Sequence, residues 1–176
     1  MEAAGLGPDT CVVDIGGGDS RLVDNLAARG MDCLAVLDVS AAALHRAQSR
    51  VGPAASALTW IEADVTGGWS LEPMDIWHDR AVFHFLTAPE DRRRYLARLH
   101  ATLKPQGTAI LATFDLDGPE KCSGLQIRKY SEEVLTSVVQ TAFHKLKCIR
   151  EDHITPFQTV QNFLFCSFQK KNAVLR

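Results

Sequence analysis

The stretch Val12-Val13-Asp14-Ile15-Gly16-Gly17-Gly18 decides the fold of this chain. Its first half is rich in β-branched residues, as a buried strand is, and its three glycines end that strand. A helical pattern follows from Ser20, so the glycine turn joins a strand to a helix and can bring bare backbone against a ligand. A dinucleotide fingerprint would need another glycine three positions after Gly18, where Arg21 stands. The turn therefore favours a ligand without a pyrophosphate over NAD or FAD.

Short apolar runs alternate with helical patterns along the rest of the chain. This alternation predicts βαβ units and a parallel sheet within a single domain over residues 1–176. The last two strands have no helix between them, so we expect them to pair antiparallel. We expect a turn at residues 104–107 and an ordered functional loop at 115–129. The expected strands are residues 11–15, 33–37, 58–61, 75–78, 108–114, 145–151 and 160–168, and the expected helices are residues 20–29, 41–51, 91–103 and 131–143.

Composition excludes several classes of protein. The net charge of −2 does not favour nucleic-acid binding, and the short basic cluster Arg92-Arg93-Arg94 is typical of a solvated helix face. No apolar run reaches the roughly 18 residues of a membrane helix, and no signal-peptide pattern opens the chain. The five cysteines are odd in number and lack metal-ligand spacing, so we expect free thiols, no metal site and a cytoplasmic location.

Two acids end the second and third expected strands. Asp38 lies 20 residues after Gly18, where a carboxylate can bind ribose hydroxyls. Asp64 can accept a hydrogen bond from an adenine amino group while Val65 packs on the ring. Taken singly, Asp38 could instead open a solvent-exposed loop, and Asp64 could form a turn or a helix cap. Together, glycines and two acids at three successive strand ends predict a ligand site at the carboxyl edge of the sheet.

These segments, in this order, resemble class I S-adenosylmethionine-dependent methyltransferases, and in particular their small bacterial-type stand-alone members. The resemblance rests on residues 12–18 (the glycine motif), Leu37-Asp38-Val39-Ser40, Glu62-Ala63-Asp64-Val65, residues 75–86 and residues 103–108. It implies an α/β fold: a doubly wound seven-stranded sheet in the order 3214576, with strand seven antiparallel and helices on both faces.

The resemblance also implies S-adenosylmethionine as the cofactor and S-adenosylhomocysteine as its product. The cofactor-binding residues that it implies are Asp14, Gly16, Gly17, Gly18, Ser20, Asp38, Val39, Ser40, Asp64, Val65 and His78. One departure concerns the cover of the site, because only ten residues precede Cys11. Glu2 to Leu6 resembles the end of a cover helix that is otherwise mostly absent, and we expect an open cleft.

The acceptor is expected over the ends of the fourth and fifth strands. His84 and Asp79 are the candidate catalytic residues, for proton transfer or for orienting the cofactor. Arg80, Lys121 and Cys122 are the candidate acceptor contacts, because a cation can bind an acidic acceptor and a thiol beside a cation is reactive. The alternatives left open are a core-edge His84, an ion pair between Asp79 and Arg80, and an inert loop thiol.

The sequence thus predicts methyl transfer to an unidentified small molecule or protein side chain, with no membrane partner and no nucleic-acid partner. The fourth strand lacks the Asn-Pro-Pro-aromatic segment of nucleic-acid methyltransferases. A module that binds the cofactor without turnover is the first alternative. A nicotinamide-dependent oxidoreductase is the second, and the absent third glycine counts against it.

Overall fold

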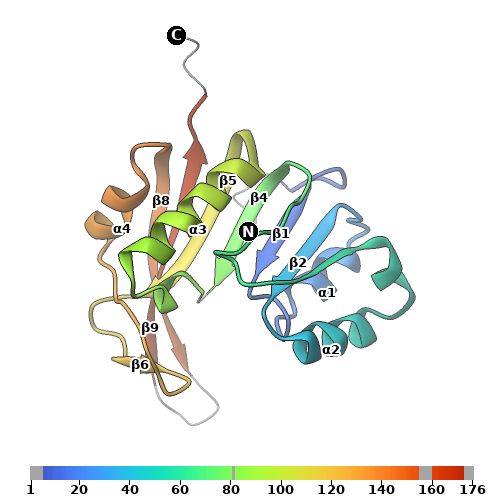
Figure 1. Cartoon of the computed structure of the whole chain (residues 1–176), viewed down its shortest axis with the longest axis horizontal. Coiled ribbons are helices and arrows are strands. Elements are labelled where there is room, and N and C mark those ends of the chain that lie inside the picture. The colour runs from blue at the N-terminus through green and yellow to red at the C-terminus, as the bar shows by residue number, and fades with distance from the viewer. Residues whose placement is uncertain (1–5, 81, 155–159, 173–176) are drawn as a thin grey trace.

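Seven strands form one sheet in the computed structural model of the chain, which describes residues 6–80, 82–154 and 160–172. The strand order is β3-β2-β1-β4-β5-β9-β8 (Figure 1). Strands β1 to β5 pair parallel, whereas β9 pairs antiparallel with both β5 and β8. The predicted order 3214576 with an antiparallel seventh strand is therefore confirmed. The strands are β1 (Val12–Ile15), β2 (Leu34–Asp38), β3 (Thr59–Glu62), β4 (Met74–Arg80), β5 (Leu103–Phe114), β8 (Phe143–Ile154) and β9 (Val160–Lys170).

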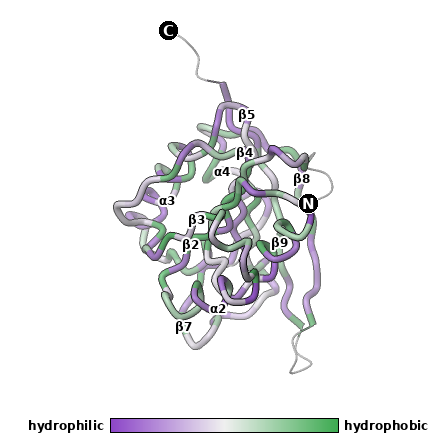
Figure 2. Tube along the Cα trace, turned by 90° about the vertical axis from the view of Figure 1, so that its right-hand side faces the viewer, coloured by the Kyte–Doolittle hydropathy of each residue, from purple (hydrophilic) through white to green (hydrophobic). Residues whose placement is uncertain are grey.

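Helices cover both faces of this sheet. They are α1 (Leu22–Ala27), α2 (Ala41–Val51), α3 (Pro89–Thr102) and α4 (Glu132–Val139), with short 3-10 helices at Gly52–Ala57 and Phe83–Phe85. Alternate residues of a strand point to opposite faces, and β1 illustrates the result. Val13 and Ile15 pack in one cluster with residues of α3 and α4, while Val12 packs in another with residues of α1 and α2. Figure 2 shows the hydrophobic stretches gathered along the sheet.

Local sequence signals set several helix ends. Ser40 caps α2, since its Oγ accepts a hydrogen bond from the Ala43 amide at 3.2 Å, and Ser131 caps α4 in the same way. Gly52, at φ +70°, ends α2. The sequence prediction started these helices at residues 41 and 131, and the α2 boundaries agree residue for residue.

Two predictions about loops need correction. Residues 104–107 are not a turn between elements: they lie inside β5 as a bulge, because Met74 pairs with Leu103 while Ile76 pairs with Thr108. Gln106 adopts φ +66° within it. The expected loop at 115–129 contains a small hairpin of β6 (Lys121–Cys122) and β7 (Leu125–Gln126).

The expectation of free thiols is wrong for four of the five cysteines. Disulfides join Cys11 to Cys33 and Cys148 to Cys166, and Cys122 is free. Sequence spacing did not reveal the pairs because they depend on strand register. Cys148 lies directly opposite Cys166 on β8 and β9, with 4.1 Å between their Cα atoms, and Cys11 and Cys33 precede the paired residues Val12 and Leu34.

One further prediction falls mostly outside the described residues: the helix end expected at Glu2 to Leu6. None of the described helices is long and apolar enough to cross a membrane.

Candidate functional site

Two neighbouring cavities open at the carboxyl ends of β1, β2 and β4. The first has a volume of about 510 Å³ and the second about 420 Å³, within the range of small-molecule sites. They share Ile15, Gly16 and Arg80 in their linings, so they meet at the glycine turn and the end of β4. The rest of the first lining is Asp14, Asp19, Ser20, Arg21, Phe114, Cys122, His153, Gln161 and Phe163. The rest of the second is Leu37, Asp38, Val39, Asp64, Val65, Val82, Phe85, Leu86 and Leu125.

Gly16 is required by the geometry of the turn between the cavities. Its φ is +68°, and a Cβ atom there would lie 2.2 Å from Cγ2 of Val82. Its amide donates a hydrogen bond to the Leu37 carbonyl at 2.7 Å. A side chain at this position would therefore force apart the glycine turn and the segment after β4.

Asp38 is held in place before any ligand arrives. Its Oδ2 accepts a hydrogen bond from the Gly18 amide at 3.1 Å, and its Oδ1 accepts one from the Ser40 amide at 2.8 Å. A Cβ atom on Gly18 would lie 2.6 Å from the Cβ of Ala43, so the turn also needs glycine here to approach α2. The carboxylate retains lone pairs for hydroxyl groups in the second cavity, which it lines.

The far end of the second cavity combines apolar surface with one acid. Val65 is buried, whereas Val39 is 69% exposed and Leu125, from the β6–β7 hairpin, is 62% exposed. Asp64 accepts hydrogen bonds through Oδ1 from the amide and the hydroxyl of Thr66, both at 2.7 Å. Large exposed apolar side chains around a cavity favour a flat apolar ligand, and a rim carboxylate can accept hydrogen bonds from its edge.

Asp14 lines the first cavity and has one carboxylate oxygen without a partner in the described part of the chain. Its Oδ1 lies 2.7 Å from Nδ1 of His78, and its Oδ2 is buried with no hydrogen-bond partner among the described residues. Gly17 allows this arrangement, because a Cβ atom there would lie 2.5 Å from that Oδ2. An unpartnered buried carboxylate oxygen is costly, and a ligand ammonium group would satisfy it.

Asp79 is fully buried and lines neither cavity. It accepts hydrogen bonds from the amides of Val82 and Phe83 and from the Tyr95 hydroxyl, which in turn accepts one from Trp77. Burial raises the pKa of Asp79 to about 6, although these donors oppose the shift. The structure does not show the alternative ion pair between Asp79 and Arg80. Asp79 instead fixes the segment after β4, which packs on Gly16 through Val82.

His84 is also fully buried and lines neither cavity. Its ring stacks on Phe114 with 4.8 Å between centroids, and neither ring nitrogen has a hydrogen-bond partner among the described residues. Burial lowers the pKa of His84 to about 4, so the ring is neutral at pH 7. Its direct contact with an acceptor stays a prediction.

The structure brings nine of the predicted site residues onto the cavity walls. They are Asp14, Gly16, Ser20, Asp38, Val39, Asp64, Val65, Arg80 and Cys122. The others do not line either cavity: Gly17, Gly18, Ser40 and His78 lie behind the walls and support them, Asp79 and His84 are buried, and Lys121 is exposed.

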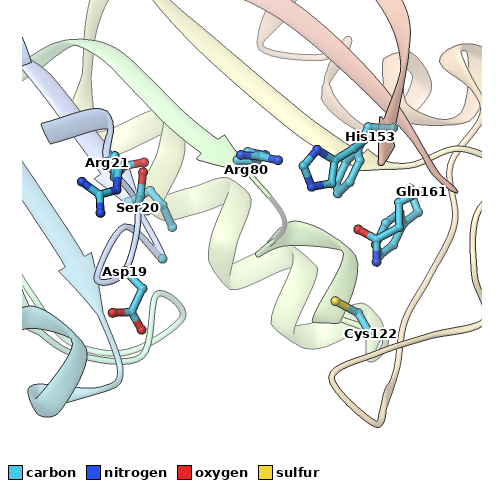
Figure 3. Close-up of a pocket in the computed structure, with 12 residues that line it drawn as sticks. Asp19, Ser20, Arg21, Arg80, Cys122, His153 and Gln161 are labelled. Atoms are coloured by element: carbon cyan, nitrogen blue, oxygen red, sulfur yellow. The ribbon is translucent and has the colours of Figure 1, made fainter. Parts of the chain in front are cut away.

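Sequence reasoning missed one wall of the first cavity. Figure 3 shows His153 and Gln161 facing Arg80 across this cavity, with Cys122 beside them and Ser20 and Arg21 on the opposite side. His153 and Gln161 are register partners on β8 and β9, so their side chains share a face. The local signal was limited to alternating polarity in these strands, which does not reveal the register.

A profile describing the methyltransferase domain matches residues 12–107, more than half of the chain. The chain belongs to the methyltransferase domain family. An uncharacterized methyltransferase of Mycobacterium tuberculosis (strain H37Rv) is 34% identical over 105 residues, which are 59% of this chain and 50% of that protein. An uncharacterized methyltransferase of Mycobacterium bovis matches to the same extent, so the alignment spans about half the length of these relatives.

Solved structures share the methyltransferase fold. The N-methyltransferase NodS from Bradyrhizobium japonicum superposes with a TM-score of 0.74 at 17% identity, over 93% of this chain and 86% of NodS. The 1,6-didemethyltoxoflavin-N1-methyltransferase of Burkholderia thailandensis, solved with its substrate and S-adenosylhomocysteine, gives 0.74 at 20% identity, over 93% and 72%. S-adenosylmethionine is the cofactor of this family, as predicted, and the nicotinamide alternative is set aside.

Proposed function

We propose that this methyltransferase transfers the methyl group of S-adenosylmethionine to a small molecule held in the first cavity. The observation that carries the proposal is the pair of cavities that meet at Gly16 and Arg80. The second cavity has the exposed apolar and acidic lining that suits a nucleoside. The first cavity is lined by Asp14, which has a carboxylate oxygen unpartnered within the described residues, and by a separate aromatic wall. A cavity of about 510 Å³ accommodates a small molecule more readily than a folded protein surface.

The residues of the two cavities fit the cofactor. Asp38 would bind the ribose hydroxyls, and Asp64, Val65 and Val39 would hold the adenine. The free Oδ2 of Asp14 would accept a hydrogen bond from the ammonium group of the methionine part. His78 keeps Asp14 in place from behind and acts as a positioning residue.

The chemistry requires mainly orientation. When bound, S-adenosylmethionine supplies an electrophilic methyl group on a sulfonium. The walls of the first cavity hold the acceptor in line, and orientation of this kind accounts for much of the rate of such displacements. An acceptor that arrives protonated must also lose a proton. We assign its removal to His153, because its ring lines the cavity whereas His84 and Asp79 do not.

A cytoplasmic location was predicted from the expectation of free thiols, and the two disulfides weaken that support, since such bonds persist in oxidising compartments. Free thiols at all five positions would support the cytoplasm, whereas intact disulfides would support an oxidising compartment. A protein side chain as acceptor and a module without turnover are the outcomes that the following experiment separates from our proposal.

Calorimetry of the purified chain with S-adenosylmethionine and S-adenosylhomocysteine, with NAD as a control ligand, tests the cofactor assignment. Asp38→Ala should weaken both by about tenfold to a hundredfold, because charge-assisted hydrogen bonds to the ribose disappear. The matched control is Asp32→Ala, which changes an exposed acid just before the start of β2. Equal affinities of Asp38→Ala and the unaltered chain would contradict the site.

Turnover is then measured as S-adenosylhomocysteine release with a library of small molecules and with a whole-cell protein extract. Release with small molecules supports the proposal. Release with proteins alone identifies a protein acceptor, and tight cofactor binding without release from either source favours a module without turnover.

A further inference from the structure

We propose that the methyl acceptor carries an anionic oxygen group, a carboxylate or a phosphate, which Arg80 binds, and a flat apolar part, which packs on Phe163. This proposal rests on the proposed function and names the substrate class of the same site.

The first cavity has two arginines whose charge no acid neutralises. Neither of its acids pairs with these arginines: Oδ1 of Asp14 lies 2.7 Å from Nδ1 of His78, and Asp19 forms hydrogen bonds of 2.6 and 2.9 Å with Arg46. Arg21 and Arg80 form no ion pair within the described ranges 6–80, 82–154 and 160–172. An unpaired guanidinium at a cavity wall is a binding group for a carboxylate or phosphate, which it can contact through two parallel hydrogen bonds.

The two arginines belong to opposite sides of the cavity. Arg21 follows Ser20 at the end of the glycine turn and therefore suits the carboxylate of the cofactor's methionine part. Arg80 ends β4 and faces His153 and Gln161 (Figure 3). The cofactor has a single carboxylate, so the second cation remains for the acceptor.

An aromatic wall stands beside Arg80. Phe163 on β9 pairs with Phe114 on β5, with 4.5 Å between ring centroids, and both line the cavity although they are almost completely buried. The Arg80 guanidinium lies over Phe163, 5.7 Å from its centroid, which fixes the height of the cation above the ring. When the anionic group of an acceptor binds Arg80, the neighbouring atoms of the acceptor therefore contact an apolar surface.

Neighbouring acids do not compete for Arg80. Asp115, which follows β5, is buried and forms an ion pair with Arg150. Asp152 accepts a hydrogen bond from Asn162. Glu151 shares the strand face of His153 but does not line the cavity. Arg80 also lines the cofactor cavity, so an anion bound to it lies close to the junction where the methyl group is transferred.

The test measures binding of simple probes to the chain saturated with S-adenosylhomocysteine. The probes are benzoate, phenyl phosphate and the neutral benzamide. Their binding is measured by saturation-transfer NMR and by calorimetry. We expect at least one anion to bind tenfold or more tightly than benzamide. Arg80→Gln should reduce its affinity about tenfold to a hundredfold, and Arg80→Lys should reduce it less. The matched control Arg29→Gln removes an exposed arginine after α1 and should leave probe affinities unchanged.

Preference between the anions identifies the source of the charge: benzoate for a carboxylate acceptor, phenyl phosphate for a phosphate one. Equal binding of anionic and neutral probes, or no binding of any anion, overturns the proposal while leaving cofactor binding intact. A tenfold loss of S-adenosylhomocysteine affinity in Arg80→Gln, with probe affinities unchanged, also overturns it, because Arg80 then serves the cofactor. If the unaltered chain does not bind S-adenosylhomocysteine, the proposed function fails first and this proposal with it.

Discussion

Removing one buried hydroxyl should destabilise the wall of the site strongly. Tyr95→Phe leaves the aromatic ring on α3 in place but deletes the hydroxyl that contacts Trp77 and Asp79 on β4. That oxygen donates a hydrogen bond to Oδ2 of Asp79 at 2.5 Å and accepts one from Nε1 of Trp77 at 2.9 Å. All three side chains are fully buried, so water does not replace the lost partner.

The two lost bonds set the size of the effect. A hydrogen bond to a carboxylate contributes about 1.5–3 kcal/mol, and a buried N–H left without a partner costs about 1–3 kcal/mol. Tyr95→Phe should therefore lower the free energy of unfolding by about 3–5 kcal/mol and the melting temperature by roughly 10 °C.

The destabilisation should grow with pH. The ordinary pKa of Asp79 is 3.8, and burial raises it to about 6 in the folded chain, so the folded state holds a proton that the unfolded state releases between these values. Stability from this group is therefore lost as pH rises from about 4 through 6. The Tyr95 hydroxyl opposes the raised pKa, so its removal raises that pKa further. The gap between Tyr95→Phe and the unaltered chain should be wider at pH 8 than at pH 5.

Denaturant unfolding at pH 5 and pH 8 measures this gap. Tyr130→Phe is the matched control, because the Tyr130 ring is equally buried but its hydroxyl has no hydrogen-bond partner among the described residues. It should change stability by less than about 1 kcal/mol. Equal losses in the two variants, or a gap that narrows as pH rises, would refute the reasoning.

Two predictions concern His84 and the cysteines. Burial lowers the pKa of His84 from 6.5 to about 4, so the folded chain favours the neutral ring. Up to about 3 kcal/mol of the free energy of unfolding is therefore lost as pH falls from 6.5 through 4. His84→Phe should remove this loss, seen by unfolding at pH 7 and pH 4.5, while retaining turnover; abolished turnover would return His84 to the catalytic residues. Alkylation of the denatured chain, prepared without reductant, should label Cys122 alone by mass spectrometry, and all five cysteines after reduction. Labelling of all five before reduction would disprove both disulfides and restore the ground for a cytoplasmic location.

The positions of several residues on the wall of the second cavity were predictable because their signals are local. Gly16 and Asp38 each follow a recognisable strand, and the carboxyl ends of neighbouring parallel strands meet at one edge. The order of the seven strands came from the family resemblance together with the final pair of strands. Neither prediction depended on the register, that is, on which residue of one strand lies beside which residue of another.

The acceptor half depends on that missing information. Gln161 and His153 come together through the register of β8 and β9, and the disulfide between Cys148 and Cys166 has the same origin. Asp79 was expected at the reacting centre because it follows the expected fourth strand, but it is fully buried and accepts a hydrogen bond from Tyr95 on α3. Contacts between residues far apart in the chain decided these outcomes.

The division of the walls between two stretches of sequence bears on how such a protein can be engineered. The family profile ends at residue 107, whereas Phe114, Cys122, His153, Gln161 and Phe163 all lie beyond it. Apart from Leu125, the second cavity is built entirely before that point. A library that randomises only residues after 107 would therefore vary one side of the first cavity and leave the second cavity nearly unchanged. Ile15, Gly16 and Arg80, which line both cavities, link the two.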